Sequence, residues 1–197
     1  MTKMVIITVI AGMFSGYFFM PESVMGISEN ILIVGLCILL FFVGIDIGHQ
    51  GTVVQNFKKV GFRVIIFPIA VIIGTMAGAA VGALFLPVTL RESLAVGAGF
   101  GWYSLAPVIL TKYSAELSAI SFMHNVFREV LGIMLIPIVA KRIGYIETTS
   151  LPGAAAMDVC LPIVERATNA DIAVYSFVSG VVLSFAVPIL VPLIAGV

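Results

Sequence analysis

Charged residues are scarce in this 197-residue chain: ten basic and ten acidic side chains make up 10% of the sequence and cancel to a formal net charge of zero. A soluble domain carries about 25% charged residues, whereas 61% of this chain is hydrophobic. The shortage of charge excludes an ordinary soluble domain and predicts an integral membrane protein. No basic run exceeds Lys58 with Lys59, so we expect no nucleic-acid partner.

Cysteines and catalytic motifs are equally sparse. Cys37 and Cys160 both lie in apolar stretches, which favours buried thiols over a disulfide or a metal site, and we expect no structural metal and no cofactor. Ser104 is the obvious candidate nucleophile, but GWYSL lacks the Gly-x-Ser-x-Gly pattern. The HExxH, Walker and dinucleotide motifs are also missing. We therefore do not expect an enzyme.

The long apolar runs predict an all-α, polytopic protein of the cytoplasmic membrane, formed by one membrane domain over residues 1–197. We expect about five transmembrane helices and two broken, re-entrant segments. Residues 1–92 supply three spans, at 4–20, 31–47 and 63–86. The loop that carries Lys58, Lys59 and Arg63 is the clearest basic loop in the chain, which places it in the cytoplasm by the positive-inside rule.

Two stretches are apolar but poorly suited to an unbroken helix. Residues 93–113 contain three glycines within five residues, followed by Trp102, Tyr103 and Ser104 and then Pro107. Residues 151–167 contain two prolines, a glycine and Asp158, and they are short for a span. Each stretch predicts half-helices around a break. The aromatic residues beside the first break either fill space or offer a face to an ammonium group.

An internal repeat links the two breaks. Shifting the chain by 55 residues without a gap aligns 98–140 with 153–195. Identities then include Pro107 with Pro162, Ala115 with Ala170, Ser121 and Phe122 with Ser176 and Phe177, and Leu135 and Pro137 with Leu190 and Pro192. We interpret residues 93–142 and 151–197 as two copies of a hairpin plus a helix in opposite orientations, a transporter plan in which broken helices form the substrate site.

The helix expected at 114–142 carries Arg128 and Glu129 near its centre. It spans about 39 Å, so both charges lie near the membrane midplane, where one charge costs roughly 2.5 to 3.5 kcal/mol. Asn125 shares a polar helical face with this pair. One interpretation is a structural ion pair that locks the helix to a neighbour; the other is a transport site.

The repeat favours a transport site because its charges are asymmetric. Arg128 and Glu129 align with Leu183 and Ser184, while Tyr103 aligns with Asp158. We predict that Glu129, Arg128 and Asp158 form the centre of a site for substrate binding or proton coupling. Further candidates are Asn125, Trp102, Tyr103 and Ser104, with Asp46 either at the site or exposed at a membrane interface.

Four motifs resemble the bacterial lysine exporter family of the LysO type: FFVGIDIG at 41–48, GFGWYSL at 99–105, NVFRE at 125–129 and MDVCLP at 157–162. The resemblance implies export of lysine and lysine analogues, coupled to proton influx, with the intramembrane acid at Glu129. Longer members carry additional amino-terminal spans. This chain is therefore expected to work as a homo-oligomer or with a separately encoded small membrane partner.

Lysine fits these residues chemically. Its two ammonium groups call for acids, and Glu129 and Asp158 are available. Its carboxylate calls for half-helix amino ends or for Arg128. A channel-like pore and a nontransporting structural subunit remain the alternatives to a secondary transporter.

Overall fold

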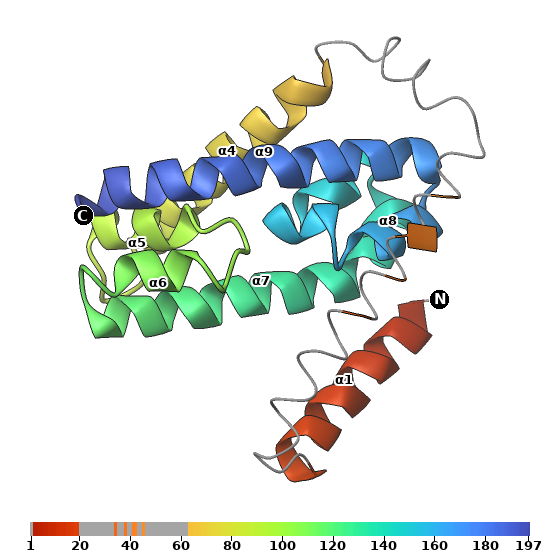
Figure 1. Cartoon of the computed structure of the whole chain (residues 1–197), viewed down its shortest axis with the longest axis horizontal. Coiled ribbons are helices and arrows are strands. Elements are labelled where there is room, and N and C mark those ends of the chain that lie inside the picture. The colour runs from red at the N-terminus through yellow and green to blue at the C-terminus, as the bar shows by residue number, and fades with distance from the viewer. Residues whose placement is uncertain (1, 20–33, 35–37, 39–40, 43–44, 46–62) are drawn as a thin grey trace.

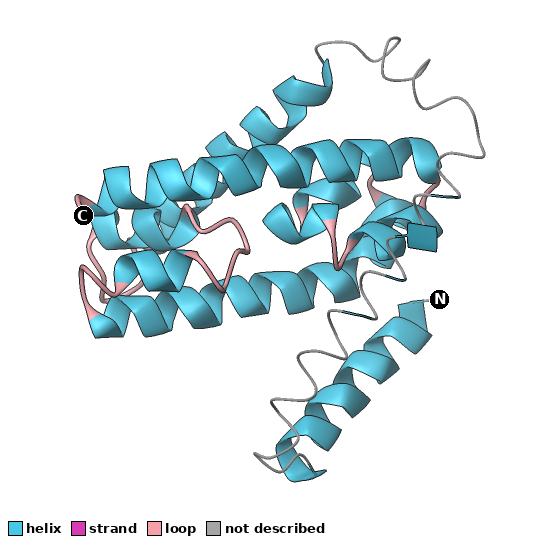
Figure 2. Cartoon of the chain, viewed as in Figure 1, coloured by secondary structure: helices cyan, strands magenta, loops and turns pink. Residues whose placement is uncertain are grey.

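The computed structural model describes residues 2–19, 34, 38, 41–42, 45 and 63–197. Within these ranges every regular element is a helix (Figures 1 and 2). Three of the helices are long and apolar enough to cross a membrane, at Val64–Gly82, Ala115–Arg142 and Ala170–Ala195. The predicted class, an all-α polytopic membrane protein, is confirmed.

The amino-terminal spans are described only in part. Helix α1, Thr2–Phe19, covers the first expected span, and α4, Arg63–Gly82, covers the third. The second expected span, at 31–47, lies almost entirely outside the described residues, and Asp46 is outside them as well.

Helices α7, Ala115–Arg142, and α9, Ala170–Ala195, form the long axis of the molecule and run in opposite directions (Figure 1). Both start in the same way, because an extended cap residue accepts a hydrogen bond from the third helical N–H. The cap is Ser114 in α7 and Asn169 in α9. Such caps satisfy backbone donors that the helix cannot bond internally.

The first broken segment is helical at both ends, as the sequence predicts. Helix α5, Leu90–Gly97, starts with a capping box between Thr89 and Glu92. The Thr89 backbone N–H and hydroxyl hold the pKa of the Glu92 carboxyl below its usual value. A non-helical stretch follows, and the short helix α6, Ala106–Leu110, then ends the segment.

The second broken segment begins with two 3₁₀ turns, η1 at Ile146–Ser150 and η2 at Gly153–Met157. Its backbone is irregular at Asp158, and helix α8, Leu161–Ala167, completes it. Both broken segments lie between α7 and α9 and approach each other from opposite ends of the molecule (Figure 2).

The helix boundaries follow the offset seen in the sequence. Helices α6 and α8 start at Ala106 and Leu161, and helices α7 and α9 start at Ala115 and Ala170. Each pair is 55 residues apart, which supports the inverted repeat as an interpretation of the fold.

Each broken segment has its own buried cluster. Phe100 and Leu110 of the first segment pack with Leu183 and Val187 of α9. In the second segment, a smaller cluster joins Val164 to other buried side chains, among them Cys160, Ile136 of α7 and Ile172 of α9. The long helices therefore hold the breaks in place between them.

Candidate functional site

A cavity of about 100 Å³ lies where the two breaks meet. Its wall is built largely from positions that correspond in the two repeats. The corresponding pairs are Trp102 and Met157, Tyr103 and Asp158, Ser104 and Val159, and Glu129 and Ser184. The same offset of 55 residues therefore relates eight of the eleven residues of the wall.

Five of the eight candidate residues line this cavity: Trp102, Tyr103, Ser104, Glu129 and Asp158. The first three come from the first break, Glu129 comes from α7, and Asp158 comes from the second break. The structure thus brings two acids that are distant in sequence to one small space. The Asp158 carboxylate also accepts a hydrogen bond from the Val159 N–H at 2.6 Å, which fixes its direction.

Asn125 supports the backbone of the first break. Its side chain is fully buried, and its Oδ1 accepts the Gly101 N–H at 2.7 Å. Its Nδ2 donates to the Ser121 carbonyl at 2.8 Å. Gly99 leaves room for this amide, since a Cβ at that position would lie 2.5 Å from Nδ2. The Asn125 side chain therefore holds the backbone of the first break in place, and it does not line the cavity.

Arg128 faces the second broken segment. Its guanidinium donates to the Leu151 and Ser150 carbonyls at 3.2 Å each and to Thr75 Oγ1 of α4 at 3.3 Å. These acceptors, and not the adjacent carboxylate of Glu129, receive the described hydrogen bonds of Arg128. The side chain joins three elements and does not line the cavity.

The two breaks also touch each other directly. The Ala154 N–H donates to the Phe100 carbonyl at 2.8 Å. Gly153 has a φ of +68°, and a Cβ there would collide with the same carbonyl. Phe100 itself has a φ of +45°, a conformation that costs a non-glycine residue on the order of 1–3 kcal/mol. The contacts around Phe100 must offset that energy, so the backbone conformation at this junction depends on the contact between the two breaks.

Six residues of the cavity wall were not named as candidates by the sequence analysis, and Ser184 is the one among them with a polar side chain. It lies on α9 opposite Glu129, and its hydroxyl is 3.7 Å from Met157 Sδ. The signal for it was present in the repeat, because Ser184 aligns with Glu129.

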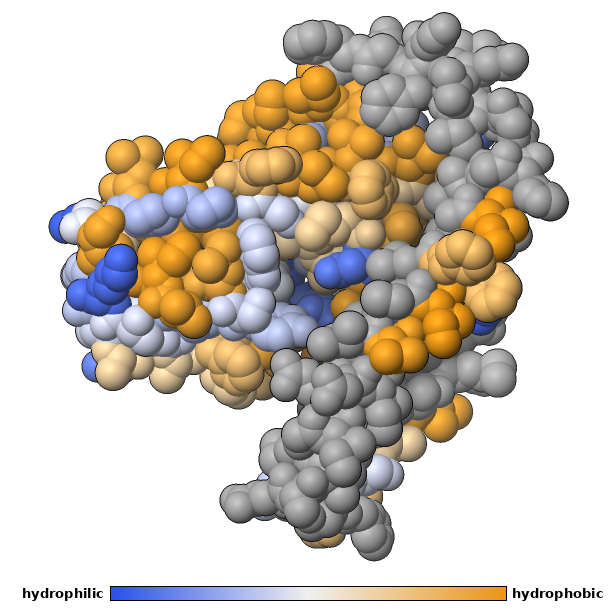
Figure 3. Space-filling model, in the orientation of Figure 1, coloured by the Kyte–Doolittle hydropathy of each residue, from blue (hydrophilic) through white to orange (hydrophobic). Residues whose placement is uncertain are grey.

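The cavity opens on one face of the molecule, between α7 and α9. Figure 3 shows hydrophilic atoms in a recess near the centre of this view. Tyr103 at the cavity wall is 38% exposed, and Ser104 is exposed. The described residues therefore leave the polar centre accessible from this side.

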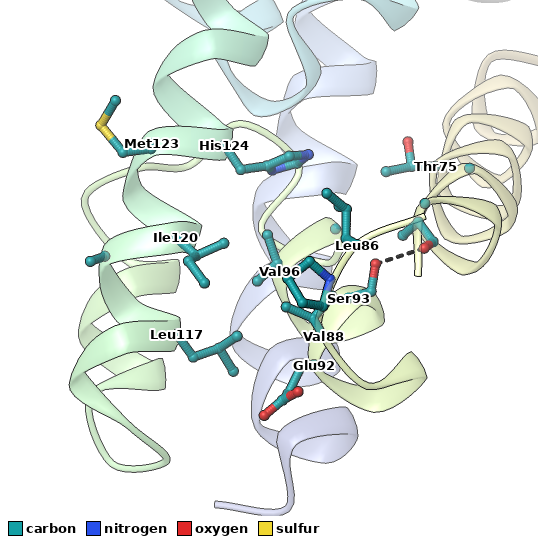
Figure 4. Close-up of a pocket in the computed structure, with 16 residues that line it drawn as sticks. Thr75, Leu86, Val88, Glu92, Ser93, Val96, Leu117, Ile120, Met123 and His124 are labelled. Carbon is teal, nitrogen blue, oxygen red and sulfur yellow. Dashed lines mark hydrogen bonds between the residues drawn. The ribbon is translucent and has the colours of Figure 1, made fainter. Parts of the chain in front are cut away.

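A second and larger cavity, of about 830 Å³, lies between α4, α5 and α7 (Figure 4). Side chains such as Leu86, Val96 and Ile120 give it an almost wholly apolar wall. His124 also lines this cavity and not the polar one. The apolar wall does not suit a substrate with several charges.

The antiparallel long helices, the two breaks between them and the acids at their junction define the class: a multi-pass membrane protein with broken helices and a polar cavity at its centre. The family model described as "Lysine exporter LysO" matches residues 6–195. The chain belongs to this lysine exporter family, as its motifs predict.

Two relatives extend this finding. The lysine exporter LysO of Escherichia coli is 32% identical over 157 residues, which are 79% of this chain and 52% of the relative. A Haemophilus influenzae protein, named provisionally as a lysine exporter, is 32% identical over 160 residues, 79% of each chain. The chain thus matches about half the length of the E. coli relative. No solved structure matches it.

Proposed function

We propose that the chain is a secondary transporter that exports L-lysine and lysine analogues across the cytoplasmic membrane in exchange for protons. The observation that supports this function most directly is the shared cavity of Glu129 and Asp158. A carboxylate in a small intramembrane space holds either a proton or an ammonium group, so successive occupation by the two exchanges one for the other. The same arrangement gives no support to catalysis.

The two acids have different proposed roles. Glu129 lies on the continuous helix α7 and carries the coupled proton or the ammonium group. Asp158 lies in the break itself, where its direction is fixed by the Val159 N–H, and it binds the ammonium group alongside Glu129. Trp102 and Tyr103 offer aromatic faces to the same cation.

Transport by the purified chain in liposomes tests this function. Vesicles loaded with labelled lysine are placed in a more acidic medium, and we expect faster lysine efflux than without the pH gradient, a gain that a protonophore abolishes. Glu129→Gln removes the exchangeable proton and should abolish the efflux, while Asp158→Asn should weaken it. Glu116→Gln is the matched control, because Glu116 is exposed in the first turn of the same helix, away from the cavity.

Other outcomes would redirect the proposal. Normal efflux by Glu129→Gln would remove that acid from the mechanism. Currents without proton coupling would indicate a channel-like pore, and dependence on sodium would replace the proton as the coupling ion. No transport by an intact, folded chain would favour a nontransporting subunit.

The open side of the cavity bears on partners. Irregular backbone and charged groups are not exposed to lipid at the depth of the hydrocarbon core, yet Tyr103 and Ser104 are exposed on this face. The proposed transporter therefore covers this face with protein, either a second copy or a separately encoded small membrane partner. Light scattering of the detergent-solubilised chain should give the mass of a homo-oligomer. A monomer that transports only after a second membrane protein is added would identify the heteromeric form.

A further inference from the structure

We infer that the cavity recognises its substrate through ammonium groups alone, and that Arg128 positions the second broken segment without binding the substrate carboxylate. The inference deepens the proposed function and rests on it. It also defines a substrate class: compounds with a terminal ammonium group on a methylene chain, as in the side chain of lysine, with or without a carboxylate.

The charges of the cavity wall are the first reason. Its ionisable groups are the carboxyls of Glu129 and Asp158 and the phenol of Tyr103. None of the residues that line it, all of them within the described part of the chain, is a lysine, an arginine or a histidine. A substrate carboxylate placed there would meet like charges in a poorly hydrated space, where repulsion is strong.

The position of Arg128 is the second reason. Its guanidinium is bonded to Leu151 and Ser150 carbonyls and to Thr75, and η1 is the turn that leads into the second break. Turning the side chain toward the cavity would leave these two carbonyls without their charged donor. Such a group costs about 1–3 kcal/mol when it is buried unsatisfied. Arg128 is thus a positioning residue.

The backbone donors are the third reason, because N–H groups at a break are the usual alternative for holding a carboxylate. Here they already have acceptors. The Gly101 N–H bonds to Asn125, the Ala154 N–H to Phe100, and the Val159 N–H to the carboxylate of Asp158. The other donors at the wall are neutral groups, such as the hydroxyls of Ser104 and Ser184 and the indole N–H of Trp102.

The size of the cavity agrees with recognition of one end of a substrate. A volume of about 100 Å³ holds only a few water molecules. This is room for an ammonium group and the methylenes next to it. An ammonium between two acids and the aromatic faces of Trp102 and Tyr103 has a complete set of partners.

Competition against lysine tests the inference. Liposomes that contain the full chain are loaded with labelled lysine together with lysinamide, 1,5-diaminopentane or norleucine. Lysinamide and 1,5-diaminopentane keep two amino groups and lack the free carboxylate, whereas norleucine keeps the carboxylate and lacks the side-chain ammonium. We expect the first two to inhibit within about threefold of unlabelled lysine, and norleucine to be at least about tenfold weaker.

The role of Arg128 is tested by the ratio of two inhibition constants, those of lysinamide and of lysine. In Arg128→Lys and Arg128→Gln the export rate should fall while this ratio stays at the parent value. Thr75→Val is a milder variant that removes one contact of Arg128 and should leave the ratio unchanged too. Weaker inhibition by lysine with unchanged inhibition by lysinamide in the Arg128 variants would overturn the inference.

A binding measurement separates this inference from the proposed function. Calorimetry of the purified chain with lysine, lysinamide and norleucine reports recognition even where no transport occurs. Binding of lysinamide without lysine transport would count against the transporter and support the inference. Transport of lysine with no binding or competition by lysinamide would do the reverse.

Discussion

At the scale of single residues, the polar side chains of α7 make different kinds of contact. Ser118 donates to the Pro107 carbonyl, Asn125 accepts the Gly101 N–H, and Arg128 donates to the second broken segment. Glu129 alone among these four lines the cavity. These polar residues of α7 therefore mostly support non-helical backbone, and Glu129 is the one that faces the cavity.

Asn125 gives a prediction at this scale. Asn125→Ala leaves the buried Gly101 N–H without an acceptor, which costs about 1–3 kcal/mol. We expect a lower melting temperature in detergent and slower lysine export in liposomes. Met123→Ala is the control, because Met123 is 48% exposed on the same helix and its truncation should leave both readings near the parent values. An unchanged melting temperature in Asn125→Ala would show that the break does not depend on this bond.

Some residue contacts could be predicted from sequence and others could not. The spacing of polar residues predicts that Asn125, Arg128 and Glu129 share a helical face, and the repeat brings Asp158 into consideration. Two of the three described acceptors of Arg128 are the backbone carbonyls of Ser150 and Leu151. Since every residue has a carbonyl, nothing in the identities of these two residues signals the contact.

At the scale of elements, each broken segment packs closely against a long helix at a glycine. The glycine lies in the break in one copy and in the helix in the other. In the first repeat a glycine in the break, Gly99, makes room for Asn125 on the helix. In the second, the helix supplies the glycine. A Cβ at Gly180 of α9 would lie 2.5 Å from the Met157 backbone nitrogen and 2.9 Å from the Ala154 carbonyl oxygen. The second break thus lies directly against the backbone of α9.

The packing at Gly180 predicts a large effect from a small change. Gly180→Ala forces η2 away from α9 and displaces Asp158, so we expect reduced thermal stability and loss of lysine export. Gly74→Ala is the matched control in α4, because a Cβ there meets no atom within 4 Å and alanine favours a helix over glycine by about 1 kcal/mol. Export by Gly180→Ala at the parent rate would mean that η2 has room to shift without disturbing the cavity.

Element boundaries were largely predictable. The helix expected at 114–142 is observed at Ala115–Arg142, with Ser114 as its cap. Glycine and proline placed both breaks, because each of these residues disfavours continued helix. The irregular course at Asp158 was not predictable in detail, since it depends on the contact with α9 and on the Ala154 bond to the first break.

At the scale of the whole molecule, the two ends of the first broken segment lie together. The Tyr113 hydroxyl is 3.4 Å from Glu92 Oε1, and Arg91 donates to the Ile194 and Ala195 carbonyls at the end of α9. This arrangement supports a re-entrant hairpin that starts and ends on the same side as the carboxyl end of α9.

Cysteine labelling tests that topology. In a background without Cys37 and Cys160, single cysteines at Glu92 and at Tyr113 should both react with a membrane-impermeant maleimide added outside intact cells. A cysteine at Lys141 should react only after the membrane is opened, since α7 crosses it. Reaction of Glu92 and Tyr113 positions from opposite sides would replace the hairpin with a continuous broken span.

The bonds of Arg128 also set an order for assembly during synthesis. Its carbonyl acceptors lie 22 and 23 residues further along the chain, so they leave the ribosome after Arg128 does. Before they arrive, Thr75 of the earlier helix α4 is the described acceptor already present, and an arginine near the centre of a membrane helix costs roughly 2.5 to 3.5 kcal/mol. The apolar residues of α7 must therefore offset this cost when the helix inserts. The second broken segment then packs against α7 and supplies the carbonyl acceptors of Arg128.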